Sequence, residues 1–176
     1  RDRVWDAVTG EELLSLDDWV RSVAWSPDGK RIATASGDGV QVWDAVTGEN
    51  ALSLEHGRWV LSVAWSPDGR RITTASGDGV RVWDAVTGEC VLSLGYGRWV
   101  LSVAWSPDGR RIAAGYAVGG VRVWDAVTGE ELLSLKRSRL ARSVAWSSDG
   151  RRITTASGDG VRVWDAVTGE ELLSLD

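Results

Sequence analysis

The sequence contains one residue that could act as a nucleophile and one that could act as its base. These are Cys90 and His56, and no other cysteine or histidine is present. A cysteine nucleophile needs a base within hydrogen-bonding distance. The strand pattern described below places these two side chains at opposite ends of one repeat, so the sequence predicts no catalytic residues and no enzyme activity. We instead interpret Cys90 as a small, buried or half-buried apolar side chain and expect His56 to bond within its own repeat.

Aspartates recur once per hairpin, which raises the question of a metal site. Calcium takes about six to eight oxygen ligands that converge on one point. Each of these aspartates precedes a glycine in a separate hairpin, so we expect them to form turns and predict no metal. No glycine-rich phosphate or dinucleotide motif indicates a cofactor. The aspartates interpreted in this way are Asp28, Asp68, Asp108 and Asp149 in one set of hairpins and Asp38, Asp78 and Asp159 in another.

Length and composition favour a domain that binds neither nucleic acid nor membranes. The 176 residues carry a formal net charge of −5, whereas proteins that bind the nucleic-acid backbone usually present a basic face. The basic cluster of Lys136, Arg137, Arg139 and Arg142 is interpreted as one solvated loop. No apolar run approaches the roughly 20 residues of a membrane span, and no secretory signal is visible. A single cysteine fits a cytoplasmic protein, and the missing initial methionine predicts a fragment, a processed product or a segment cut from a longer chain.

A repeat of about 40 residues dominates the sequence. The block Val-Trp-Asp-Ala-Val-Thr-Gly-Glu occurs five times, and its tryptophans are separated by 38, 40, 41 and 40 residues. The block Ser-Val-Ala-Trp-Ser occurs four times. The repeats are near-identical but each has its own deviations, which favours recent duplication followed by drift, with engineering as the alternative. The tryptophans of the two blocks are Trp5, Trp43, Trp83, Trp124 and Trp164, and Trp25, Trp65, Trp105 and Trp146.

Each repeat divides into four apolar runs separated by turn residues. Alternating apolar and polar residues predict strands, while glycine and proline predict the tight turns between them. Four short strands joined in this way form one antiparallel sheet. Because such a sheet is apolar on both faces, it needs a neighbour on either side, which predicts sheets stacked around an axis. In the second repeat the runs are 58–66, 71–76, 80–83 and 90–94.

The period, the four strands, the Ser-Pro-Asp-Gly turn and the Trp-Asp pair that closes the third strand resemble the WD-repeat (WD40) family over essentially the whole chain. The resemblance implies an all-β fold, a β-propeller of four-stranded antiparallel blades. We predict four full blades after an N-terminal half blade that holds only a third and a fourth strand. Residues 3–17 repeat residues 162–176 without a difference, so either copy could complete the last blade. The expected boundaries are 1–16 for the partial blade, 17–54 for blade one, 55–94 for blade two, 95–135 for blade three and 136–176 for blade four.

The resemblance also implies a hydrogen-bonded tetrad in blade two. The turn that holds its aspartate, Asp78, is one residue shorter than the family pattern. The other blades lack the histidine, and Tyr96 and Arg137 stand at its position in blades three and four. The tetrad therefore cannot be the general source of stability, and burial of tryptophan and valine must supply more of it. The members of the implied tetrad are His56, Thr74, Asp78 and Trp83.

Four blades of this kind fill only part of a ring, because propellers of this family usually have about seven within the general range of four to eight. The open ends would expose apolar blade faces, and soluble monomers rarely expose patches beyond a few hundred Å². We therefore expect the ends to be covered, most simply by two chains that form an eight-bladed ring with twofold symmetry. Two alternatives stay open: a slice of a longer chain that closes by itself, and a closed four-bladed monomer.

A row of large side chains opens the first strand of each blade, and two of its tryptophans follow an arginine. Both residue types are enriched at binding hot spots, and in the WD-repeat family partners dock at this end of the strand. The row either docks a partner or caps the core near the central channel. We predict a non-enzymatic scaffold that binds a protein or peptide there and completes its ring as a homo-oligomer; the alternative is a purely structural, self-assembling propeller fragment without a dedicated ligand. The predicted binding residues are Trp19, Arg58, Trp59, Arg98, Trp99 and Leu140.

Overall fold

β-Strands and turns account for all of the regular structure in the computed structural model, which describes residues 2–16, 19–95, 99–136 and 140–175. Four sheets of four strands follow one another along the chain after a two-stranded hairpin. This arrangement confirms the predicted all-β propeller of four-stranded antiparallel blades, with four full blades and an N-terminal half blade. Within the described ranges, no helix has the length and apolarity that crossing a membrane requires.

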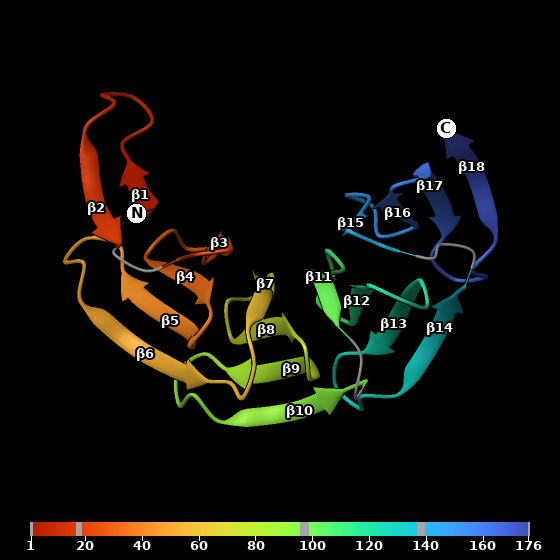
Figure 1. The fold of residues 1–176 in the computed structure, drawn as a ribbon, viewed down its shortest axis with the longest axis horizontal. Helices are drawn as coiled ribbons and strands as arrows, with labels where there is room; N and C mark the ends of the chain where they lie inside the picture. The colour runs from red at the N-terminus through yellow and green to blue at the C-terminus, as the bar shows by residue number, and fades with distance from the viewer. Residues whose placement is uncertain (1, 17–18, 96–98, 137–139, 176) are drawn as a thin grey trace.

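Within each blade the strands pair in chain order, each with the next, so every blade is an antiparallel meander (Figure 1). The half blade consists of β1 (Asp2–Trp5) and β2 (Glu12–Leu16). Blades one and two consist of β3 (Ser22–Trp25), β4 (Arg31–Ser36), β5 (Gly39–Asp44) and β6 (Asn50–Glu55), and of β7 (Val60–Trp65), β8 (Arg71–Ser76), β9 (Gly79–Asp84) and β10 (Cys90–Leu94). Blades three and four consist of β11 (Val100–Trp105), β12 (Arg111–Tyr116), β13 (Val121–Asp125) and β14 (Glu131–Leu135), and of β15 (Ser143–Trp146), β16 (Arg152–Ser157), β17 (Gly160–Asp165) and β18 (Glu171–Leu175).

Tight turns hold the strands of a blade in register. In blade two, Gly69 closes the hairpin between β7 and β8 with a φ of 70°, which glycine adopts more readily than other residues. Gly79 opens β9 with a φ of 125°, and a Cβ there would collide with a backbone carbonyl. These turns align Ile72 of β8 with Trp65 on one side and Trp83 on the other. Each blade therefore presents matched apolar rows to its two neighbours.

The hydrophobic core lies between blades rather than within a blade. Between blades one and two, Val42 and Leu54 of blade one pack with Val60 and Ile72 of blade two, and none of the four is more than 2% exposed. Two further cores of the same kind join blade two to blade three and blade three to blade four. The apolar side chains on a blade face without a neighbouring blade are therefore not buried in a core.

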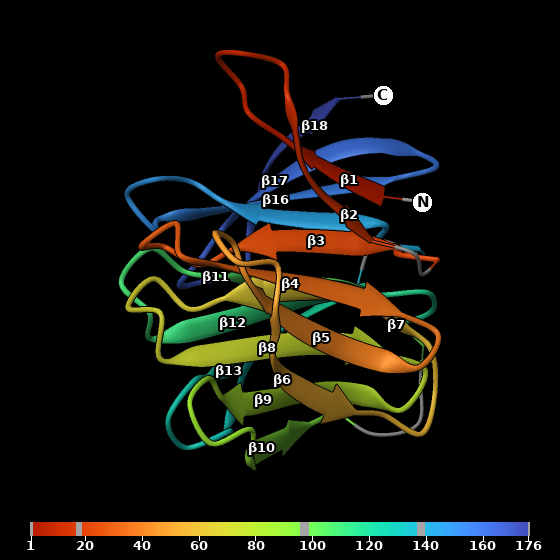
Figure 2. The same ribbon diagram turned by 90° about the vertical axis from the view of Figure 1, so that its left-hand side faces the viewer.

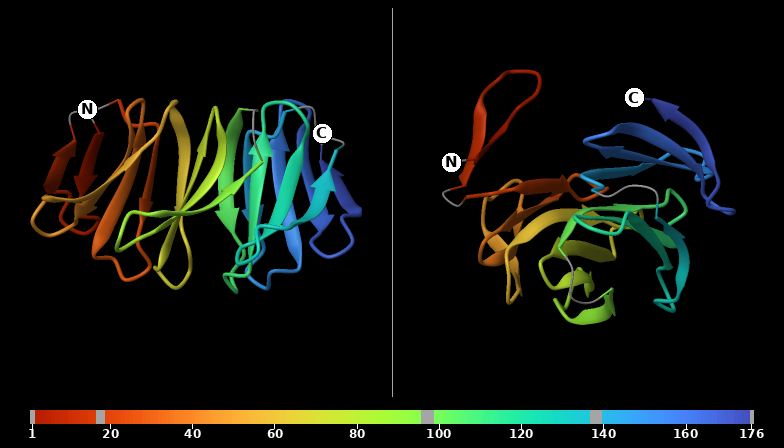
Figure 3. Two further views of the ribbon diagram at one scale, coloured as in Figure 1. Left: turned by 90° about the horizontal axis from the view of Figure 1, so that it is seen from below. Right: turned by 45° about the vertical axis from the view of Figure 1, so that its right-hand side comes forward.

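The four blades follow an arc that is open on one side, and both chain ends lie near this opening (Figure 1). The β1–β2 hairpin continues the arc beyond blade one. Seen from the edge, the blades stand at one level and do not climb along the axis of the arc (Figure 3). The arrangement is thus a flat, incomplete ring of blades.

Candidate binding face

The strands run roughly along the axis of the arc, so their ends form two opposite faces (Figure 2). The first, here called the tryptophan face, carries the loops between blades and the hairpins between the second and third strands, such as residues 77–78. The second, here called the valine face, carries the turns between the first and second strands and the loops between the third and fourth. The predicted binding residues that the structure describes all lie on the tryptophan face, whereas the exposed loop valines of the other face are Val46, Val86, Val127 and Val167.

Among the described residues, three large aromatic side chains are exposed on the tryptophan face. Trp19 is 93% exposed, Trp59 is 52% exposed and Trp99 is 45% exposed, while Leu140 at the same position in blade four is half-buried. Trp59 and Trp99 each lie against a hairpin of the preceding blade, and the N-terminal half blade offers Trp19 no such hairpin. The row therefore continues from blade to blade but does not enter the core.

Trp59 lies between two groups of blade one. Its indole covers Gly37, where an added Cβ would lie 3.6 Å from Nε1. The guanidinium of Arg21 lies over the ring, with its carbon 4.5 Å from the ring centroid. A cation at this distance is attracted to the electron-rich face of the indole. Arg21 therefore holds Trp59 in one orientation while half of its surface stays accessible.

Trp99 repeats this arrangement one blade further. Its indole covers Gly77, where an added Cβ would lie 3.5 Å from the ring. Arg58 passes beside the same glycine, and its Nε bonds the carboxylate of Asp78 at 3.0 Å. Beside this group lies a cavity of about 360 Å³, and its wall combines charged, hydroxyl and apolar side chains. The cavity is lined by Arg58, Gly77, Asp78, Val80, Arg81, Ser93, Leu94 and Trp99.

The residues of the implied tetrad separate into two groups. Trp83 donates its indole hydrogen to Thr74 Oγ1 at 2.9 Å, and the equivalent bond forms in blades one and four. Asp78 pairs with Arg58 instead of His56. Neither ring nitrogen of His56 has a hydrogen-bond partner among the described residues, and the imidazole packs edge-on against Trp83 with centroids 5.1 Å apart. His56 thus contacts its own blade through ring packing rather than through the expected hydrogen bond.

Burial lowers the pKa of His56. Its pKa is lowered from 6.5 to about 4, mainly by desolvation and also by the positive charge of Arg81, while the negative charge of Asp78 opposes the change. Burial disfavours the charged imidazolium because the charged form loses more hydration than the neutral form. His56 is therefore neutral at physiological pH and cannot supply a positive charge to the tryptophan face.

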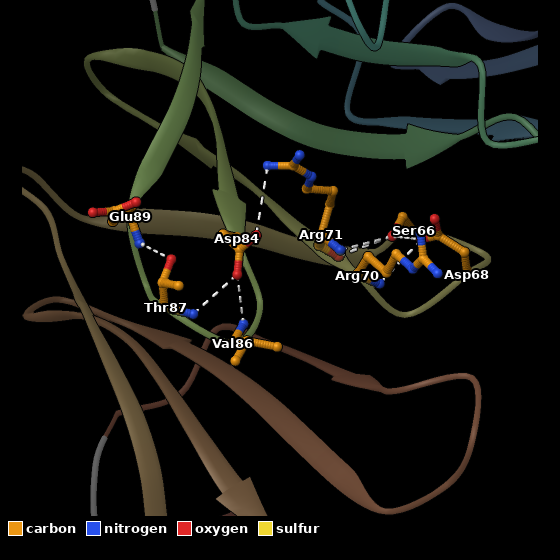
Figure 4. A network of polar contacts seen from close by, with 8 residues as sticks. All are labelled: Ser66, Asp68, Arg70, Arg71, Asp84, Val86, Thr87 and Glu89. Carbon is orange, nitrogen blue, oxygen red and sulfur yellow. Dashed lines mark hydrogen bonds and ion pairs between the residues drawn. The ribbon is translucent and has the colours of Figure 1, made fainter.

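On the valine face, the repeated aspartates close their own turns (Figure 4). Asp68 accepts hydrogen bonds from the Ser66 hydroxyl at 2.6 Å and from the backbone N–H of Arg70 at 3.0 Å, and these bonds lower its pKa. Asp84 accepts from the backbone N–H groups of Thr87 and Val86, both at 2.9 Å, and its pKa is lowered for the same reason. Within the described part of the chain, no three metal-ligating side chains gather at one point.

Some residues differ from the sequence-based expectation, and others lie outside the described residues. Cys90 is exposed rather than buried, because it begins the outermost strand of blade two; its thiol donates to the carbonyl of Leu92 at 3.4 Å. Arg98, a predicted binding residue, lies outside the described residues, as do Tyr96 and Arg137. Sequence reasoning did not single out Arg21, although strand alternation places it on the same side of the chain as Trp19.

Comparison with known proteins agrees with this architecture. A family model described as "WD domain, G-beta repeat" matches residues 10–44, 48–84, 88–125 and 130–165. Coronin-7 of Mus musculus is 52% identical over 40 residues, which are 21% of this chain and 4% of coronin-7. The crystal structure of the computationally designed Ika8 protein superposes with a TM-score of 0.83 at 27% identity, over 99% of this chain and 55% of the designed chain. The chain therefore spans about half of that solved chain and a small part of its curated relative.

Proposed function

Because this chain belongs to the family of WD domain, G-beta repeats, we propose that it is a non-enzymatic scaffold that binds a protein or peptide on its tryptophan face. Propellers of this family generally serve as scaffolds that mediate protein interactions. The architecture alone does not select a ligand, because one fold can support many functions. The proposal therefore depends on the chemistry of this face.

The observation that carries the proposal is the exposed row of Trp59 and Trp99, each held in place by the neighbouring blade. Trp59 has the Gly37 hairpin beneath it and Arg21 above it, and Trp99 lies on the Gly77 hairpin beside Arg58. A rigid, half-exposed indole offers a large contact area and loses little conformational freedom on binding. Such aromatic and arginine side chains dominate binding energy in protein interfaces.

The cavity beside Trp99 indicates what kind of ligand would fit. Its apolar wall, with Val80 and Leu94, suits an aliphatic or aromatic side chain, whereas Arg81 and Ser93 can bond a peptide carbonyl or a carboxylate. The net charge of −5 disfavours nucleic acid, whose phosphates require a basic surface. A peptide that inserts one apolar side chain and lies across the indoles matches all of these groups.

A selection from a phage-displayed random peptide library tests this proposal. Peptides enriched on the chain are expected to bind the double variant Trp59→Ala, Trp99→Ala at least about tenfold more weakly, because each indole supplies buried contact area. The matched control is Val86→Ala, Val127→Ala, which removes exposed apolar groups from the valine face and should leave affinity unchanged. Enriched peptides that respond only to the valine-face variant would contradict the proposal.

A second candidate function is purely structural assembly, and the open ends of the arc favour it. Val23 and Trp25 of blade one are 58% and 50% exposed, and Leu173 and Leu175 of blade four are 49% and 52% exposed. In this alternative the arc exists to associate, and the tryptophan face has no dedicated ligand. The peptide selection would then enrich nothing that distinguishes the two faces.

A further inference from the structure

A repeating set of hydrogen bonds joins each blade to the next. A serine in the first strand of one blade accepts a hydrogen bond from a valine backbone N–H in the following blade. This contact occurs at all three junctions between full blades, with nearly constant length. The bonds run from Val63 N to Ser22 Oγ at 3.2 Å, from Val103 N to Ser62 Oγ at 3.3 Å and from Val144 N to Ser102 Oγ at 3.3 Å.

Tryptophan and arginine complete the junction. The indole of Trp65 donates to the carbonyl of Ala24 at 3.2 Å, and Trp146 donates to Ala104 in the same way. In the opposite direction, Arg31 reaches the carbonyl of Ala85 in the next blade at 3.0 Å. Arg111 makes the equivalent contact with blade four. These two junctions are directional: the earlier blade offers a serine, an alanine carbonyl and an arginine, and the later blade offers a valine N–H, an indole and an alanine carbonyl. The junction between blades two and three keeps the serine bond, but neither Nε1 of Trp105 nor Nη1 of Arg71 has a hydrogen-bond partner among the described residues.

The two ends of the arc carry the two unmatched halves of this junction. Blade one presents the indole of Trp25 and the backbone N–H of Val23, neither of which is bonded to another blade among the described residues. Blade four presents Ser143, and its outer strand leaves Leu175 52% exposed, whereas the equivalent Leu135 of blade three is 3% exposed. The hydrogen-bond donors at the exposed end of blade one therefore match the kinds of acceptor that blade four presents at the other end.

We propose that blade four of one chain docks against blade one of a second copy, through the same contacts that join blade one to blade two and blade three to blade four. Ser143 accepts from Val23 of the second copy, the carbonyl of Ala145 accepts from its Trp25, and Arg152 reaches its Ala45 carbonyl. The flat arc turns without climbing, so two such joints close a ring rather than extend into a filament. The partner is thus this chain itself.

The N-terminal hairpin does not form the joint. It repeats the sequence of β17–β18 from Arg3 onward, but Asp2 stands where β17 has Val161. Val161 pairs with Ala156 of β16 and with Leu175 of β18, so the hairpin would bring a carboxylate into the ladder at this point. Pairing of β16 with its own β17 is therefore favoured over pairing with the hairpin. The hairpin moves away from blade one when the second copy docks.

One substitution weakens the joint relative to the internal junctions. At each internal junction the ring of a proline packs beside a glycine of the next blade, with 3.6 Å between the Pro27 Cδ and an added Cβ at Gly69. Blade four has Ser148 in place of this proline. The joint between chains therefore lacks one apolar contact that the internal junctions have, and Ser148→Pro should restore it.

Sedimentation velocity of the full chain, from about 1 to about 100 µM, tests the joint because self-association depends on concentration. The expected species has twice the 19.0 kDa mass of one chain. Trp25→Ala should weaken dimerisation about thirtyfold or more, as expected for a hot-spot tryptophan. The matched control is Trp5→Ala in the hairpin, where the tryptophan is 52% exposed against 50% for Trp25 and where no effect is expected. Ser148→Pro should strengthen dimerisation.

Three results would overturn the inference. A monomer at the highest concentration would mean that the ends are covered by something other than a second copy. Species that grow without limit would exclude the closed ring. Equal weakening by Trp5→Ala and Trp25→Ala would place the hairpin at the joint. Because the joint lies on blade faces and the peptide site on the tryptophan face, Trp25→Ala and Trp59→Ala separate the failure of one proposal from the failure of the other.

Discussion

Trp25 and Trp65 occupy the same position in neighbouring blades, within the same local sequence, yet Trp25 is 50% exposed and Trp65 is 9% exposed. Trp65 lies against blade one and bonds the carbonyl of Ala24. Trp25 has only the half blade beside it. Local sequence therefore determines the strand and the turn, whereas position in the arc determines how much each side chain contributes to stability.

The largest expected effect is a difference in the free energy of unfolding between alanine variants of these two tryptophans. Trp65→Ala should lower the free energy of unfolding by about 3–5 kcal/mol, because it leaves a cavity between two blades. Trp25→Ala should lower it by about 1 kcal/mol or less in the monomer, because half of the indole is already in water. Urea unfolding followed by tryptophan fluorescence, at a concentration where the chain is monomeric, measures both. Equal losses would remove the distinction between interior and end blades.

Acid should destabilise the interior through His56, which no end blade possesses. Between pH 6.5 and about 4 the unfolded imidazole binds a proton that the folded one does not, so stability is complete above pH 6.5 and falls as the pH drops to about 4. The expected loss is about 3 kcal/mol. The turn aspartates, with pKa values lowered from 3.8, lose their contribution only below this window.

His56→Gln serves as the control for the acid effect, because a glutamine does not titrate. Its stability should be nearly flat between pH 6.5 and 4 in urea titrations at a series of pH values. A variant as acid-sensitive as the original chain would show that another group is responsible.

A smaller effect is expected from the bond between tryptophan and threonine. Thr74→Val removes the acceptor of the buried Trp83 indole and should lower the free energy of unfolding by about 2 kcal/mol, since a buried donor is left unpaired. Thr34→Val removes the same bond in blade one, where Trp43 is half-buried and water can replace the hydroxyl. We expect about half the loss there, measured by the same urea titration. A larger loss for Thr34→Val would contradict the order of burial.

The smallest effect is expected on the tryptophan face. Arg58→Gln breaks the ion pair with Asp78, whose side chains are 59% and 32% exposed, and should change the free energy of unfolding by about 0.5 kcal/mol or less. Repeating the unfolding in high salt should make the variant and the original chain alike, because salt screens exposed charges. A loss above about 1 kcal/mol would show that Arg58 stabilises the blade itself rather than its surface.

The fold could be predicted because it depends on sequence patterns between residues that are close together in the chain. The hairpin glycines, the alternation around Trp83 and the period of about 40 residues all act within one blade. The bond from Trp83 to Thr74 follows from the register of two adjacent strands, which the turn between them fixes. These features need no knowledge of what lies beside the blade.

The candidate site was predicted less completely, because its contacts join residues that are far apart within a repeat or that belong to different blades. The pairing of Asp78 with Arg58 instead of His56 depends on the short hairpin and on an arginine from the preceding loop. The position of Arg21 over Trp59 joins side chains of two blades, and no single repeat contains both. Exposure of Cys90 likewise follows from the edge position of β10 rather than from its neighbours in sequence.

The backbone hydrogen bonds between strands form within single blades, and this determines the order in which parts of the chain unfold locally. No strand ladder runs from one blade to the next among the described residues, and the bonds between blades are mostly to side chains, apart from the backbone bond from Ala141 to Tyr116. The molecule therefore behaves as a linear series of cooperative units. Local opening should begin at the terminal units, which have one coupled neighbour, and reach the central ones last. Amide hydrogen exchange of the monomer should therefore be slowest in β8 and β12 and fastest in β1 and β18, whereas a closed ring would have no terminal unit from which to open.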